Sequence, residues 1–118
     1  MLNQIKSFFQ NLFSKADVEQ VVGNSGANDI ASLVKNGAFL VDMRTESEFQ
    51  QGHAPGSINV PLSKLGRNMS LFDGKKNIVV FCHSGNRSEY AKDVLVNKGL
   101  KNVYNGGAWA DIQRIINE

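Results

Sequence analysis

Two short, continuous apolar runs constrain the fold of this chain more than any other feature. They are residues 38–41 (Ala-Phe-Leu-Val) and 78–81 (Ile-Val-Val-Phe), and each is followed by a polar turn and a segment with helical spacing. Runs of this length without alternation are typical of strands buried on both faces, as in parallel sheets covered by helices. The sequence therefore predicts one α/β domain with a central, mostly parallel sheet flanked by helices. With 42% apolar residues in 118, such a domain needs no disulfide or metal to complete its core.

Capping residues, helix stop signals and the spacing of apolar residues predict the other elements. Thr45-Glu46-Ser47-Glu48 matches a capping box and predicts a short helix ending at Gly52. Asn36-Gly37 and Asn97-Lys98-Gly99 are stop signals for helices that precede them. The remaining expected elements are a helix over 28–35, a short strand over 57–60, short helices over 61–72 broken near Gly66, a helix over 89–100, a strand over 102–104 and a terminal helix containing Trp109.

Residues 1–16 form a separate segment in front of the domain expected over 17–118. Leu2, Ile5, Phe8, Phe9, Leu12 and Phe13 recur at helical spacing, which predicts an amphipathic helix. Polar residues interrupt this apolar face, so we expect neither a signal peptide nor a membrane-spanning helix. A helix packed on the domain or on a second copy, giving a homodimer, is favoured. A membrane-surface helix is the weaker alternative because only Lys6 and Lys15 would attract anionic lipid, and disorder is the third.

The charge and the cysteine count narrow the class of partner. A net charge of +2, spread along the chain, does not indicate nucleic-acid binding. The single cysteine cannot form an internal disulfide, and together with two histidines it lacks the spacing of metal ligands. We therefore expect no metal site and a reducing, cytoplasmic location.

The single cysteine, Cys82, lies where the second apolar run ends and a tight polar loop begins. A strand, a short loop and a helix in succession direct several backbone N–H groups to one point. A sulfur there would be stabilised as a thiolate, the reactive form, by amides of residues 84 to 88 and by the helix dipole. Arg87 adds a positive charge that would attract an anionic donor. A buried structural cysteine is the alternative, and the composition of the loop, residues 83–88, favours a reactive thiol.

Two more segments end at the same edge of the expected sheet. They are Asp42-Met43-Arg44 and Asn105-Gly106-Gly107. Ligands of open parallel sheets bind beyond the carboxyl ends of the strands, so these segments and Cys82 are expected to form one site. For Arg44 the sequence leaves two roles open, an ion pair with Glu48 or another carboxylate, or a contact at the rim of the site.

Three stretches together resemble the rhodanese family of sulfurtransferases. They are residues 40–61 with Asp42-Met43-Arg44 and Gly52-His53-Ala54-Pro55-Gly56, residues 80–88 around Cys82, and Gly106-Gly107-Ala108-Trp109. The resemblance covers residues 28–117 and leaves the N-terminal segment outside.

The resemblance implies a single rhodanese-like domain that transfers a sulfane sulfur without an organic cofactor. Cys82 would be the catalytic residue and would carry the sulfur as a persulfide between two half-reactions. The donor would be thiosulfate or a persulfide, and the acceptor cyanide or a thiol, which includes a thioredoxin-like or sulfur-relay protein. Donor binding would fall to His83, Ser84, Gly85, Asn86, Arg87, Ser88 and Arg44.

The length of the loop separates related activities. Four residues lie between Cys82 and Arg87, whereas related phosphatases of the cell-division-cycle type have five. The shorter loop suits one extra sulfur rather than a tetrahedral phosphate. His83 and the Arg87-Ser88 end depart from the mercaptopyruvate-using relatives. The predicted function is therefore a thiosulfate sulfurtransferase of the rhodanese type, and the alternative is a sulfur-delivery module that acts with a partner protein and turns over little alone.

Overall fold

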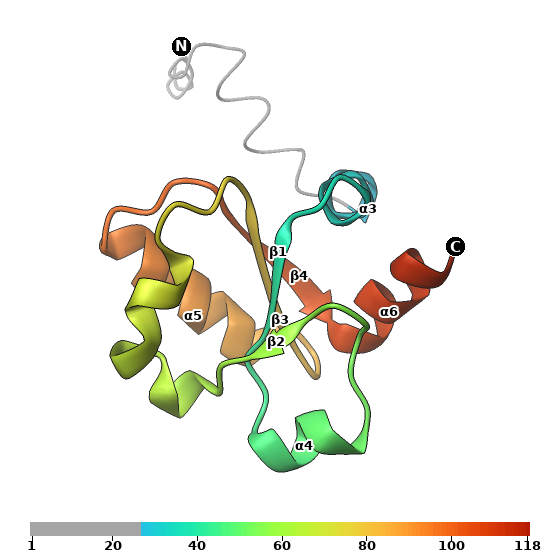
Figure 1. Ribbon diagram of the computed structural model, residues 1–118, viewed down its shortest axis with the longest axis horizontal. Helices are drawn as coiled ribbons and strands as arrows, with labels where there is room; N and C mark the ends of the chain where they lie inside the picture. Colours follow the sequence, from blue (N-terminus) through green and yellow to red (C-terminus); the bar gives the residue numbers. More distant parts are fainter. Residues whose placement is uncertain (1–26) are drawn as a thin grey trace, which may run out of the picture. The chain divides into compact units, whose positions relative to one another are not determined.

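A computed structural model describes residues 27–118. The helix predicted over 1–16 and the segment over 17–26 lie outside the described residues. In the described chain four strands form one sheet in the order β2-β1-β3-β4, and each neighbouring pair is parallel (Figure 1). The strands are β1 (Phe39–Asp42), β2 (Ile58–Asn59), β3 (Ile78–Cys82) and β4 (Val103–Ala108). The predicted α/β fold with a parallel sheet is confirmed.

Helices flank this sheet on both sides. They are α3 (Ala27–Lys35), α4 (Glu46–Gln51), the 3-10 helices η1 (Leu62–Lys64) and η2 (Gly66–Phe72), α5 (Asn86–Asn97) and α6 (Trp109–Asn117). In Figure 1, α5, η1 and η2 lie on one side of the sheet and α6 lies on the other. The predicted capping box is present: Thr45 Oγ1 accepts from the Glu48 N–H, Glu48 accepts from the Thr45 N–H, and α4 ends at Gly52.

Two elements differ most from their predicted bounds. Helix α5 begins at Asn86 rather than Glu89, because the left-handed Gly85 ends the loop and its carbonyl already accepts the Glu89 N–H. Strand β4 continues to Ala108 instead of ending at Tyr104, because Phe81 and Cys82 of β3 pair with Gly107 and Ala108. The neighbouring strand thus overrides the low strand propensity of glycine.

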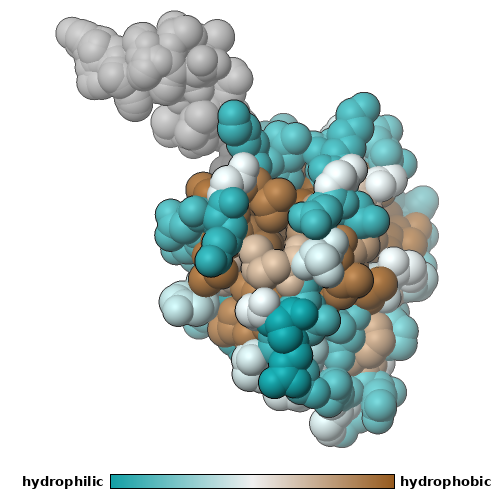
Figure 2. Space-filling view, turned by 60° about the vertical axis from the view of Figure 1, so that its left-hand side comes forward, coloured by the Kyte–Doolittle hydropathy of each residue, from teal (hydrophilic) through white to brown (hydrophobic). Residues whose placement is uncertain are grey.

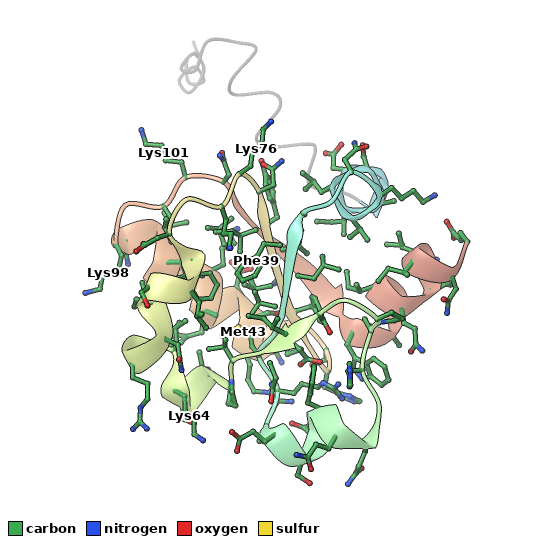
Figure 3. All side chains as sticks on the ribbon, viewed as in Figure 1. Phe39, Met43, Lys64, Lys76, Lys98 and Lys101 are labelled. Atoms are coloured by element: carbon green, nitrogen blue, oxygen red, sulfur yellow. The ribbon has the colours of Figure 1, made fainter. Side chains whose placement is uncertain are left out.

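Strand β3 is buried along its whole length and divides the core into two halves. Because side chains alternate along a strand, Ile78, Val80 and Cys82 share one face. These three belong to the apolar cluster that includes Ala91 and Leu95 of α5. Phe39 and Met43 likewise lie inside the fold, whereas Lys64, Lys76, Lys98 and Lys101 extend outward (Figure 3).

The surface of the described domain is mostly polar. Leu71, Tyr90 and Val96 are its exposed large apolar side chains, and Figure 2 shows apolar patches bordered by hydrophilic residues on the face that it displays. Among residues 27–118, no helix combines the length and the apolar character that crossing a membrane would require.

Gly106 gives a direct test of this packing. A Cβ at this position would lie 2.8 Å from Val79 Cγ1 and 2.9 Å from Ile112 Cδ1. Overpacking of this kind costs about 1–3 kcal/mol, so we expect Gly106→Ala to lower the urea midpoint. Gly66→Ala is the matched control, because its Cβ would meet nothing within 4 Å. Equal midpoints for the two variants would contradict the close contact between β4, β3 and α6.

Candidate active site

The sulfur of Cys82 lies at the carboxyl end of β3, under the loop that leads into α5. The Gly85 N–H donates to the Cys82 sulfur at 3.1 Å, and the Ser88 hydroxyl lies 3.4 Å from the same sulfur. Gly85 has φ of +101°, a conformation that glycine adopts without strain. This turn folds the loop back over the sulfur within three residues, so the predicted convergence of loop amides on position 82 is seen for Gly85.

Burial and hydrogen bonding act in opposite directions on this thiol. Burial favours the neutral form, but hydrogen bonds from the Ser88 hydroxyl and from the N–H groups of Ser88, Gly85 and Ser84 outweigh it, and the pKa of Cys82 is lowered from its ordinary value. Hydrogen bonds to the anion stabilise it selectively. The site therefore enriches the nucleophilic thiolate.

Asn105 on β4 holds the loop from the opposite side. Its Nδ2 donates to the Gly85 carbonyl at 3.1 Å and to Glu89 Oε1 at 2.9 Å. Its Oδ1 accepts from the Gly107 N–H at 2.9 Å and lies 2.7 Å from the Ser88 hydroxyl. The predicted meeting of the Asn105-Gly106-Gly107 segment with the cysteine loop is therefore observed.

Arg87 points to α4 and forms a two-pronged ion pair with Glu48. The distances are 2.8 Å for Nη1–Oε1 and 3.2 Å for Nη2–Oε2. The Arg87 bond and the Thr45 N–H lower the pKa of Glu48 from 4.5 to about 2. The contact joins residues 39 apart, and the capping-box pattern did not indicate that Glu48 has Arg87 as a second partner. The Glu48 carboxylate offsets much of the positive charge that Arg87 was expected to bring to the rim of the site.

Arg44 is buried and pairs with Asp42, not with Glu48. Its Nε lies 3.0 Å from both carboxylate oxygens of Asp42, and its Nη2 donates to Asp42 Oδ2 at 2.8 Å and to the Gly52 carbonyl at 2.7 Å. Its guanidinium also lies 4.4 Å from the centre of the Trp109 ring. Arg44 thus connects the ends of β1 and α4 with the start of α6. The predicted contact between Arg44 and a substrate stays a prediction.

The other predicted site residues lie in the loop that follows Cys82 and at the start of α5. His83, Ser84 and Asn86 are exposed at the top of the loop, Gly85 and Arg87 are half-buried, and Ser88 is buried. Their roles in binding a donor stay predictions. Within residues 27–118 no cluster of three or more histidine, cysteine, aspartate or glutamate side chains has a metal-binding arrangement.

Several lysines lie at the other end of the sheet from Cys82. Lys76 precedes β3, and Lys98 and Lys101 lie between α5 and β4, all at the amino ends of the strands (Figure 3). Cys82 is at the carboxyl end of β3. Stabilisation of a negative sulfur thus comes from the loop amides and hydroxyl rather than from lysines.

Comparison with known proteins agrees with this geometry. Residues 26–110 match the family model described as "Rhodanese-like domain", and the chain belongs to this family. "Thiosulfate sulfurtransferase PspE" of Escherichia coli (strain K12) is 34% identical over 74 residues, which cover 61% of this chain and 71% of that protein. The solved structure described as "rhodanese with anions from E. coli" is 31% identical with a TM-score of 0.58, covering 64% of this chain and 91% of that one.

Another relative is named as a sulfur carrier rather than as a sulfurtransferase. "Putative sulfur carrier protein YrkF" of Bacillus subtilis (strain 168) is 32% identical over 66 residues, which cover 56% of this chain and 36% of that protein. The chain thus spans well under two thirds of this longer relative. The chain is thus similar to proteins named for both roles.

The Glu48–Arg87 pair predicts an unusual carboxylate titration. We expect Glu48 to titrate near pH 2 in a carboxyl NMR titration, and Arg87→Gln to move its pKa toward the ordinary value. Since the folded-state pKa is depressed, the pair contributes stability above the unfolded-state pKa and loses it as pH falls toward about 2. The contribution is small because both side chains are more than a third exposed.

Lys64→Gln is the matched control for this titration, because Lys64 pairs with Glu46, the other acid in the first turn of α4. It should leave the pKa of Glu48 in place. A Glu48 carboxyl that titrates in its ordinary range in the unmodified protein would show that the ion pair is absent in solution.

Proposed function

We propose that this protein is a sulfurtransferase that moves a sulfane sulfur through a persulfide on Cys82. The observation that carries the proposal is the position of one thiol, with a lowered pKa, under amides and a hydroxyl that favour its anion. Membership of the rhodanese-like family and the identity with a relative named thiosulfate sulfurtransferase support it.

The chemistry consists of two displacements at sulfur. In the first, the Cys82 thiolate attacks the outer sulfur of thiosulfate, a new S–S bond forms, and the old S–S bond breaks with its electron pair leaving on sulfite. In the second, cyanide or a thiolate takes the outer sulfur, and the electron pair of the broken bond returns to Cys82. Each step leaves an anion at the loop, so the same donors serve both.

Access to the sulfur limits which acceptors react quickly. Cys82 is 1% exposed, while His83, Ser84 and Asn86 above it are exposed. A donor or acceptor therefore has to insert a narrow terminal atom as the loop side chains move aside. Sulfane sulfur, cyanide and a thiolate each present one, whereas a bulky ester does not.

A sulfur-delivery module is the second candidate, and the similarity to a relative named as a sulfur carrier favours it. In that role Cys82 would accept sulfur from one protein and pass it to a second, such as a thioredoxin-like or sulfur-relay protein. The persulfide would form as before, but free turnover with cyanide would be slow. The pairing of Arg87 with Glu48 fits this role, because it offsets charge that would hold free thiosulfate.

The decisive experiment combines mass spectrometry with a thiocyanate assay. After incubation with thiosulfate, the unmodified chain should gain the mass of one sulfur and then lose it on addition of cyanide, with release of thiocyanate. Cys82→Ser should show neither. His53→Ala is the matched control, because His53 Nδ1 contacts only the Phe49 carbonyl and its ring stacks on Phe49, outside the loop.

The outcomes separate the two candidates. Persulfide with rapid thiocyanate release supports the sulfurtransferase, and persulfide with slow release that a carrier protein accelerates supports delivery. A chain that takes up no sulfur from thiosulfate or from a persulfide donor, while Cys82 reacts with small alkylating agents, would refute both.

A further inference from the structure

The hydrogen bonds around Ser88 require one particular direction for its hydroxyl. Ser88 Oγ lies 2.7 Å from Asn105 Oδ1 and 3.4 Å from the Cys82 sulfur. A serine hydroxyl has a single hydrogen, so it can donate to only one of these two atoms at a time. The atom that accepts this hydrogen bond is determined by whether Asn105 and Cys82 present an acceptor or a donor to Ser88.

The orientation of the Asn105 amide is determined by its other partners. Oδ1 accepts from the Gly107 N–H at 2.9 Å, and Nδ2 faces two acceptors, the Gly85 carbonyl and Glu89 Oε1. Exchanging the oxygen and nitrogen would set a donor against Gly107 and an acceptor against two other acceptors. Oδ1 therefore faces Ser88, and since it carries no hydrogen, the hydroxyl must donate to Asn105.

In the neutral protein this leaves a lone pair of Ser88 directed at Cys82. The Cys82 S–H then donates to Ser88, and Ser88 donates to Asn105, forming a chain in one direction. When the sulfur loses its proton to a base in solution, it no longer donates to Ser88 and can accept a further hydrogen bond beside the one from the Gly85 N–H. The Ser88 hydroxyl can supply one only by turning away from Asn105 Oδ1, which keeps its bond from Gly107.

We infer that Asn105 is a positioning residue for the reactive sulfur, competing with the Cys82 anion for the single hydrogen of Ser88. Asn105 stabilises the protonated resting state of the loop and releases the hydroxyl when a thiolate or persulfide forms. The inference rests on the proposed function for its purpose. Its test reads the thiol directly, so a protein without sulfur transfer could still pass it.

The charged groups around the loop are mostly paired, and the bond to Glu89 that Asn105→Ala removes is lost equally with and without the Ser88 hydroxyl. Arg87 pairs with Glu48 and Arg44 with Asp42, and Glu89 accepts from Asn105 while lying near Lys92. His83 follows Cys82 directly and is exposed. None of them contacts Ser88 through a hydrogen bond that would fix its hydroxyl instead of Asn105.

The test is a double-mutant cycle on the reactivity of Cys82. Alkylation by iodoacetamide is followed as a function of pH in the unmodified protein, in Asn105→Ala, in Ser88→Ala and in the double variant. Below the pKa, the rate reports the thiolate fraction. One net hydrogen bond corresponds to about threefold or more in that fraction. Where the Ser88 hydroxyl is present, Asn105→Ala should therefore accelerate alkylation by about that factor. Its effect in the Ser88→Ala background should be smaller by the same factor.

A purely structural Asn105 would behave differently. Losing its bond to the Gly85 carbonyl would loosen the loop and change the alkylation rate by the same factor with or without the Ser88 hydroxyl, and this result would overturn the inference. Asn102→Ala is the matched control, since Asn102 donates to the Lys76 carbonyl at the other end of β3 and β4, and it should change nothing.

An infrared measurement on the unmodified protein keeps the inference testable if Asn105→Ala fails to fold. The S–H stretch of the only cysteine should show a hydrogen-bonded donor at low pH, and Ser88→Ala should shift it toward the position of a free thiol. A free S–H band in the unmodified protein would overturn the inference.

Discussion

The complete burial of strand β3 is the constraint on which the site depends. Its five residues are buried, it pairs with β1 on one side and β4 on the other, and its last residue is Cys82. The position of the sulfur is therefore set by core packing rather than by a mobile loop. Parallel pairing also places Asp42 of β1 beside Phe81 and Asn105 of β4 beside Val80. From this position Asn105 reaches the cysteine loop at Gly85 and Ser88.

The loop over the sulfur is held from two elements that are distant in sequence. Asn105 of β4 binds its backbone at Gly85, and Glu48 of α4 binds Arg87. These bonds keep the Gly85 N–H directed at the sulfur before any charge develops, so this donor need not reorganise when an anion forms there. The same bonds satisfy polar groups that would otherwise be costly at the edge of the core.

Most of the fold could be predicted because its signals are local. The apolar runs, the Thr45–Glu48 capping box and the glycine stops fix where elements begin and end within a few residues. The contacts that complete the site are not local: Glu48 reaches Arg87 across 39 positions, and Asn105 reaches Ser88 across 17. The extension of β4 through two glycines also depends on pairing with β3, which no propensity in residues 105–108 reveals. The sequence singled out Cys82, while the residues that hold its loop became visible only in three dimensions.

The charges of the site favour an anion on the sulfur of Cys82, but they do little to attract an anionic donor from solution. Both arginines near the loop are neutralised, Arg44 by Asp42 and Arg87 by Glu48. The donors that remain for the sulfur are the dipoles of backbone N–H groups and of one hydroxyl, and these act strongly only on an atom that they touch. Under the proposed function, they favour thiolate and persulfide but give little long-range attraction for thiosulfate. A free dianion would have to draw Arg87 away from Glu48, whereas a persulfide presented by a carrier protein could reach the sulfur with that pair intact.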